Sequence, residues 1–197
     1  GKETNFVTQI PIGTSGNAFG FFVDGRTSSV WLDNRINSVA FTHRLNTPSS
    51  GHIGYDVSFD KGLTWQVDQL NYDPTVTGFF PARYPMGGII NPTGNTDPQN
   101  AVHTYIAPTL DNSNGNWGGI GYGAKGFAPD ATPWQATFTS TPNERWFLPD
   151  AFTITQQGVL WFVDEETDYT SGTSVYLGSI RVVKGIYDAE TGEIEYT

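Results

Sequence analysis

Two pairs of neighbouring residues carry side chains that could bind a ligand. Asp33 and Arg35 stand on either side of Asn34, and a guanidinium group offers a planar fork of donors that fits a carboxylate. Arg83 and Tyr84 stand directly before a proline and could line a pocket. The alternative for the first pair is a surface ion pair beside a turn, and for the second pair it is packing at a strand edge.

Patterns typical of catalytic or metal sites are absent from the sequence. There is no Gly-x-Ser-x-Gly elbow, phosphate-binding loop or dinucleotide fingerprint. The absence of cysteine excludes disulfides and thiolate zinc sites. His43, His52 and His103 lack the i, i+4 spacing of a metal-binding pair, so we expect them in the core or on the surface. The acidic stretch Glu165–Gly172 could hold a cation, although a solvated loop is the simpler interpretation. The sequence predicts no catalytic residue, metal or cofactor.

Composition excludes several classes of protein. The 197 residues include 23 Gly, 12 Pro and 14% aromatics, and the net charge is −10. The aromatics supply too much apolar surface for a disordered chain, and the many turn-forming residues argue against a helical bundle. No basic patch is present for nucleic acid, and no apolar run is long enough for membrane insertion as a helix. We therefore expect many short strands joined by tight turns.

Short apolar or alternating segments recur along the chain between Gly, Pro, Asn and Asp residues. The expected strands are Ala18–Val23, Ser29–Asp33, Val39–Asn46, His52–Ser58, Leu63–Gln69, Pro81–Ile90 with an interruption at Gly87-Gly88, Ala101–Pro108, Trp117–Gly123, Ala151–Thr155, Val159–Asp164 and Ser174–Lys184. A final hairpin is expected to turn at 188–192. The pattern restarts roughly every 65–70 residues, which favours a β-propeller built from repeated sheets. A single antiparallel sandwich is the alternative.

One segment fits a defined pattern at every fixed position. Ser58-Phe59-Asp60-Lys61-Gly62-Leu63-Thr64-Trp65 matches Ser-x-Asp-x-Gly-x-Thr-Trp and resembles the Asp box, or bacterial neuraminidase repeat, of sialidases and many secreted β-propellers. In such a hairpin, Asp60 can accept from backbone N–H groups of the turn, and Gly62 supplies a positive φ. Ser58 ends one strand, Thr64 starts the next, and Trp65 lays its ring against the sheet. The resemblance implies a structural turn between the third and fourth strands of the first blade.

The resemblance also implies the architecture of the whole chain. We expect an all-β propeller of four-stranded antiparallel blades, with about three blades at residues 16–75, 80–140 and 147–197. Three blades do not close a ring, so we expect this chain to be the N-terminal part of a larger propeller of roughly six to eight blades.

Sialidases of the Asp-box family bind the substrate carboxylate with three arginines and open on an Arg-Ile-Pro motif. This chain has Gln9-Ile10-Pro11 instead. We therefore expect a non-catalytic module that binds protein or glycan. The alternatives are the N-terminal half of a sialidase-like glycoside hydrolase, and a structural or assembly subunit with open sheet edges.

The amino-acid sequence of residues 83–95 is similar to segments of large propeller proteins that Bacteroidetes export through the type 9 secretion system. This similarity implies a secreted or cell-surface bacterial protein. Its expected partners are other protein chains, from the secretion machinery or a surface assembly, and surface glycans, but not nucleic acid.

Overall fold

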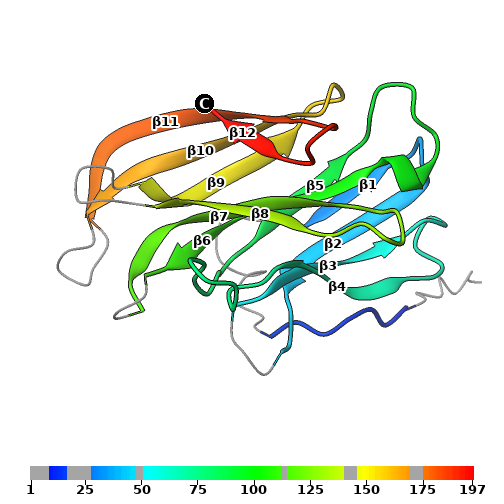
Figure 1. The fold of residues 1–197 in the computed structure, drawn as a ribbon, viewed down its shortest axis with the longest axis horizontal. Coiled ribbons are helices and arrows are strands. Elements are labelled where there is room, and N and C mark those ends of the chain that lie inside the picture. Colours follow the sequence, from blue (N-terminus) through cyan, green and yellow to red (C-terminus); the bar gives the residue numbers. More distant parts are fainter. Residues whose placement is uncertain (1–8, 17–27, 48–50, 112–114, 140–145, 169–174) are drawn as a thin grey trace, which may run out of the picture.

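The chain folds into three four-stranded antiparallel sheets in the computed structural model, which describes residues 9–16, 28–47, 51–111, 115–139, 146–168 and 175–197 (Figure 1). The first sheet contains β1 (Val30–Asp33), β2 (Ser38–Arg44), β3 (Ile53–Ser58) and β4 (Gln66–Tyr72). The second contains β5 (Met86–Ile90), β6 (Val102–Leu110), β7 (Trp117–Gly126) and β8 (Trp134–Thr139), with the short 3₁₀ helix η1 (Pro98–Asn100) before β6. The third contains β9 (Trp146–Ile154), β10 (Val159–Asp168), β11 (Val175–Tyr187) and β12 (Ile194–Tyr196).

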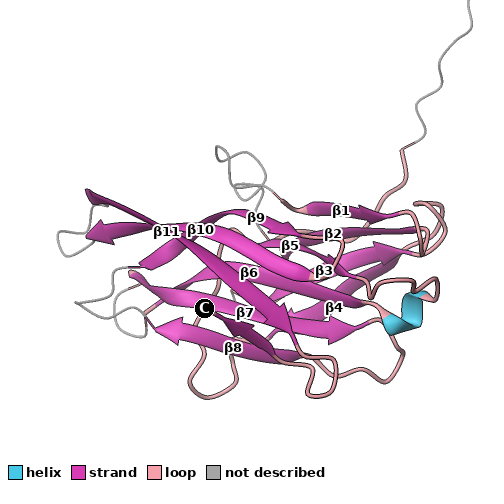
Figure 2. Cartoon of the chain, turned by 90° about the horizontal axis from the view of Figure 1, so that it is seen from above, coloured by secondary structure: helices cyan, strands magenta, loops and turns pink. Residues whose placement is uncertain are grey.

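Each sheet is a meander in which neighbouring strands follow one another in sequence. The strands of the three sheets run roughly along the long axis of the molecule (Figure 2). The all-β class and the four-stranded antiparallel sheets confirm this part of the sequence prediction. Among the described residues, no helix is long and apolar enough to cross a membrane.

The second sheet lies between the other two and buries side chains on both of its faces. Ile106 and Ile120 on one face pack with Phe152 and Phe162 of the third sheet. Tyr105, on the opposite face, packs with residues of the first sheet such as Ile53 and Tyr72. Because both faces are covered, β5 and β6 are buried at almost every position instead of alternating.

The first strand of the second sheet, β5, lies beside the first strands of the other two sheets, β1 and β9. The side chains of Trp31 of β1 and Ile154 of β9 both lie close to Gly88 of β5, and a Cβ on Gly88 would lie 2.8 Å from Cδ2 of Trp31. A Cβ on Gly87 would collide with Thr42 of β2. The expected interruption at Gly87-Gly88 is therefore wrong, because β5 is continuous and the two glycines allow the sheets to approach closely.

Two further expectations need correction. The acidic stretch predicted as a loop from Glu165 instead continues β10 as far as Asp168. The register of β10 shifts relative to β9 between Asp164 and Glu166, and relative to β11 between Glu165 and Thr167. Strand β8 was not expected, although its sequence alternates Trp134, Ala136 and Phe138 with polar residues. The expected strand at 18–23 lies outside the described residues.

The final hairpin agrees with the sequence prediction. Asp188–Gly192 forms the turn between β11 and β12, which pair in antiparallel register from Gly185↔Tyr196 to Tyr187↔Ile194. The Asp188 carboxylate accepts a hydrogen bond from the N–H of Glu190, as short acidic side chains do in turns. This part of the fold is fixed by residues that are close together in sequence.

Candidate functional site

A cavity of about 370 Å³ lies where the ends of β1, β5 and β9 meet. The residues that line it come from all three sheets: Trp31, Leu32, Asp33, Asn34, Arg35, Ile89, Asn91, Ile154, Thr155 and Gln156. One candidate pair from the sequence, Asp33 and Arg35, is therefore placed in a cavity rather than on a flat surface.

Arg35 binds Asp33 in a two-pronged arrangement. Nη2 of Arg35 lies 2.7 Å from Oδ2 of Asp33, and Nε lies 3.2 Å from Oδ1. The backbone N–H of Arg35 also donates to Oδ1 at 2.8 Å. The two side chains therefore form a local ion pair between residues two positions apart. Its geometry is that of a guanidinium fork on a carboxylate.

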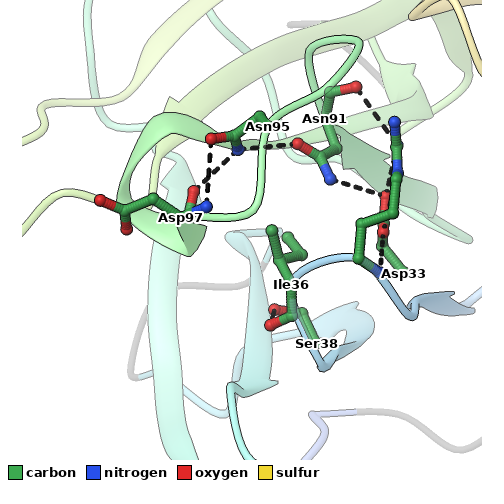
Figure 3. A network of polar contacts seen from close by, with 7 residues as sticks. Asp33, Ile36, Ser38, Asn91, Asn95 and Asp97 are labelled. Carbon is green, nitrogen blue, oxygen red and sulfur yellow. Dashed lines mark hydrogen bonds and ion pairs between the residues drawn. The ribbon is translucent and has the colours of Figure 1, made fainter.

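Asn91, from the residue after β5, extends this pair into a network (Figure 3). Its side-chain amide donates to Oδ2 of Asp33 at 3.0 Å, and its carbonyl oxygen accepts from Nη2 of Arg35 at 3.3 Å. Asn95 donates to Oδ1 of Asn91 at 2.8 Å and accepts from the N–H of Asp97 at 3.1 Å. Local spacing indicated the first pair, but Asn91 is 58 residues from Asp33 and could not be assigned to it from sequence.

The pKa of the Asp33 carboxyl is lowered from its ordinary value. Burial raises this pKa, but the hydrogen bonds from Arg35 and Asn91 outweigh burial. Asp33 is therefore an anion held by four N–H donors, and it is the one carboxylate among the described residues that line the cavity. Glycosidases of the common type use two carboxyl groups on either side of the scissile bond, and the described lining of this cavity contains one. The nearby indole of Trp31 and the amides suit a neutral, hydroxyl-rich ligand.

The second candidate pair, Arg83 and Tyr84, lies before the first residue of β5, whereas Asn91 follows its last residue. Nη1 of Arg83 donates to the carbonyl of Ala82 at 2.9 Å, and the ring of Tyr84 packs on Trp117 with centroids 5.9 Å apart. The structure therefore does not bring Arg83 and Tyr84 to the Asp33–Arg35 pair.

Ser58–Trp65 forms the turn between β3 and β4. Oδ1 of Asp60 accepts from the N–H groups of Leu63 at 3.0 Å and Thr64 at 2.8 Å, and Oδ2 accepts from the Thr64 hydroxyl at 2.6 Å. Oγ of Ser58 donates to Oδ1 of Asp60 at 2.8 Å and accepts from the N–H of Gly62 at 2.7 Å.

Backbone conformation and an aromatic contact complete this turn. Lys61 has φ 64° and Gly62 has φ 89°, so two successive residues adopt the left-handed conformation. The indole N–H of Trp65 donates to the carbonyl of Gly62 at 3.0 Å. Both carboxylate oxygens of Asp60 accept hydrogen bonds from residues of the same turn, so Asp60 organises a structural turn.

The hydrogen bonds in this turn lower the pKa of Asp60 to about 2, mainly through the hydroxyl and N–H of Thr64. Because the folded-state pKa lies below the unfolded value, Asp60 stabilises the fold above about pH 4. That stabilisation is lost as the pH falls towards 2. We expect Asp60→Ala to lower the unfolding temperature at pH 7 and to have progressively less effect below pH 4.

Thermal unfolding of both proteins between pH 2 and 7 measures this difference. The exposed Asp130→Ala is the control, and its unfolding temperature should stay close to the wild-type value at each pH. A difference between Asp60→Ala and wild type that does not shrink at low pH would contradict the role of the carboxylate.

The histidines behave differently from one another. His103 is fully buried, its ring stacks on Tyr55 with centroids 4.0 Å apart, and its nitrogens contact Thr42 and Asn71, each at 2.8 Å. Burial lowers the pKa of His103 to about 3, so it is neutral in the core. His43 is also buried, but it lies beside two carboxylates, an arrangement that the spacing of the histidines did not indicate.

The third sheet has one face that no other described element covers. Cross-strand pairs on this face are Val159↔Ile186, Trp161↔Lys184, Val163↔Val182 and Glu165↔Ile180. Ile180 and Val182 are each 65% exposed, and Ile186 is 52% exposed. We call this surface the outer face of the third sheet. Contiguous exposed apolar residues of this kind mark interaction surfaces.

Known proteins provide no assignment for either surface. Comparisons with protein-family models, with curated proteins and with solved structures gave no match.

Proposed function

We propose that this chain is a non-catalytic Asp-box β-propeller module of an exported bacterial surface protein, and that it binds protein through the outer face of the third sheet. The Ser58–Trp65 turn supports the propeller family, because its hydrogen bonds are those that the motif requires. The resemblance of this motif to secreted propellers supports the exported location.

The packing of the sheets supports a propeller arrangement. In a propeller, four-stranded blades pack face to face around a central axis. Here each sheet is a four-stranded meander, and the first strand of each sheet lies beside the first strand of the next. The aromatic and aliphatic clusters lie between the sheets, as blade-to-blade packing requires.

The outer face of the third sheet is the observation that carries the binding proposal. Strand β10 alternates strictly near its start: Leu160 and Phe162 point into the core, whereas Trp161 and Val163 point to the opposite side. An amphipathic strand would place polar residues on that side, but this strand is apolar on both. A strand that is apolar on both faces is typical of a sheet buried on both sides.

The occupant that fits this face is a further four-stranded β-sheet with an apolar surface. Both interfaces between sheets within the chain are of this kind. Lys184 and Glu165 are the charged residues of the β10–β11 pairs on this face, and at its edges Asp150 of β9 pairs with Val163 and Glu195 of β12 pairs with Ile186. The apolar residues at the centre of this face match the apolar surface of another sheet.

Site-specific photo-crosslinking in the cells that produce the protein tests this proposal. A benzoylphenylalanine at position 182 samples the outer face, one at position 32 samples the cavity, and one at the exposed position 76 serves as the control. We expect position 182 to crosslink to a β-strand segment, in the same polypeptide or in another, and position 76 to give no such product.

Mass spectrometry of the crosslinked peptides separates the outcomes. A strand peptide attached at 182 supports the proposal. No adduct at 182 overturns it, and a sugar adduct at 32 without an adduct at 182 would favour glycan binding in the cavity instead.

A further inference from the structure

Three side chains from neighbouring strands of the first sheet converge beneath Gly13. They are His43 of β2, Asp56 of β3 and Asp68 of β4, and one ligand atom from each lies within 4.8 Å of the others. A Cβ on Gly13 would lie 2.6 Å from Oδ1 of Asp56 and 2.9 Å from Oδ1 of Asp68. The backbone at Gly13 therefore lies close to both carboxylates, and no larger residue would fit there.

The hydrogen bond of the other ring nitrogen fixes the orientation of His43. Nδ1 lies 3.0 Å from the carbonyl oxygen of Arg44. A carbonyl can only accept, so Nδ1 carries a proton and donates it. Nε2 is then the nitrogen that faces the carboxylates, 3.1 Å from Oδ1 of Asp56. It is fully buried, and no described residue donates a hydrogen bond to it.

Asp56 is fully buried and anchored by backbone donors. Its Oδ2 accepts from the N–H of Gly13 at 3.0 Å, and its Oδ1 accepts from the N–H of Asp68 at 2.7 Å. Asp68 lies where the register between β3 and β4 shifts, and its φ of 54° is left-handed. The bulge brings both the N–H and the carboxylate of Asp68 to Asp56.

We propose that His43, Asp56 and Asp68 bind a divalent transition-metal cation of the Zn²⁺ class. A buried nitrogen lone pair beside two carboxylates needs a positive charge between them, and Zn²⁺ accepts this mixture of nitrogen and oxygen ligands. Ca²⁺ and Mg²⁺ prefer oxygen ligands alone. The site is separate from the outer face and does not depend on the proposed protein binding.

The distances are compatible with such a cation. Ligands about 2.1 Å from a tetrahedral Zn²⁺ lie about 3.4 Å from one another. The pair formed by His43 and Asp56 is already near this separation at 3.1 Å. Asp68 is exposed, so rotation of its side chain can close the remaining gap. Donation from the other ring nitrogen to a backbone carbonyl is also the usual support of a metal-bound histidine.

A proton is the competing source of positive charge, since a protonated His43 would form an ion pair with Asp56 without any metal. Asp68→Asn distinguishes the two because it removes a metal ligand and leaves His43 and Asp56 intact. Asparagine tolerates the left-handed conformation at this position, so we expect the variant to fold.

Zinc titration of the chelator-treated 197-residue chain by calorimetry, at neutral pH, is the test. We expect one Zn²⁺ per chain and an affinity at least tenfold weaker in Asp68→Asn. The matched control is Asp73→Asn, because His52 and Asp73 form another His–Asp pair at 3.1 Å without a second carboxylate ligand in the described part of the chain. This control should bind Zn²⁺ like the wild type.

A second measurement covers the case in which a variant is less stable. A ligand that binds the native state stabilises it. Zn²⁺ should therefore raise the unfolding temperature of the wild type and of Asp73→Asn, and it should raise that of Asp68→Asn much less. Absence of one-to-one binding by the wild type, or equal binding by wild type and Asp68→Asn, would overturn the proposal.

Discussion

Replacing Phe162 by alanine is expected to lower the free energy of unfolding by about 3–5 kcal/mol. The Phe162 side chain is 1% exposed and lies in the core between the second and third sheets, where its ring contacts Tyr196 with centroids 5.3 Å apart. The substitution removes buried apolar surface and leaves a cavity that neighbouring strands can only partly fill. This loss is a large part of the roughly 5–15 kcal/mol that stabilises a typical domain.

Val182→Ala is the matched control for this prediction. Val182 lies on β11, beside the residue that pairs with Phe162, but it points to the outer face and is 65% exposed. We expect its effect to stay within about 0.5 kcal/mol in the 197-residue chain, as for other exposed positions. Urea denaturation followed by circular dichroism measures both variants. Equal losses would show that the two faces of the third sheet are not different in burial.

Gly88→Val is expected to lower the free energy of unfolding by about 2–3 kcal/mol, near the upper end for overpacked cores. The Cβ of the new side chain would lie 2.8 Å from Cδ2 of Trp31 on β1 and 2.9 Å from Cδ1 of Ile154 on β9, before its two methyl groups are placed. Both neighbours are packed against other side chains, so the first strands of the sheets would have to move apart. The substitution therefore tests how closely β1, β5 and β9 approach one another.

Thr153→Val provides the comparison, because it also places a valine in a strand but at an exposed position of β9. We expect a change within about 0.5 kcal/mol for this variant. The same urea denaturation applies to both proteins. A Gly88→Val variant as stable as the wild type would contradict the tight contact at Gly88.

Much of the local structure could be read from residues close together in the chain. The Asp60 turn is closed by bonds between residues at most four positions apart, so its eight-residue pattern was sufficient to place it between two strands. The pair of Asp33 and Arg35 is equally local. Turns of this kind depend on side-chain length and on permitted φ values, which the sequence specifies directly.

Long-range features were not accessible in the same way. The contact of Asn91 with Asp33 depends on β1 lying beside β5. The convergence of His43, Asp56 and Asp68 depends on strand register and on one bulge, and a shift of a single residue would turn these side chains to opposite faces. The Gly87-Gly88 pair resembles a break in the strand when only its neighbours in sequence are considered, because its role is close packing against other sheets.

The all-β class, the positions of many strands and the turn at Ser58–Trp65 follow from local sequence patterns. The physical reason is that alternation, aromatic content and turn chemistry act over a few residues. The packing of the sheets against one another buries the second sheet on both sides and leaves the apolar outer face of the third sheet uncovered by other described residues. It also brings together the side chains that meet in the cavity and beneath Gly13. Those outcomes depend on how whole sheets pack, and no short segment encodes that packing.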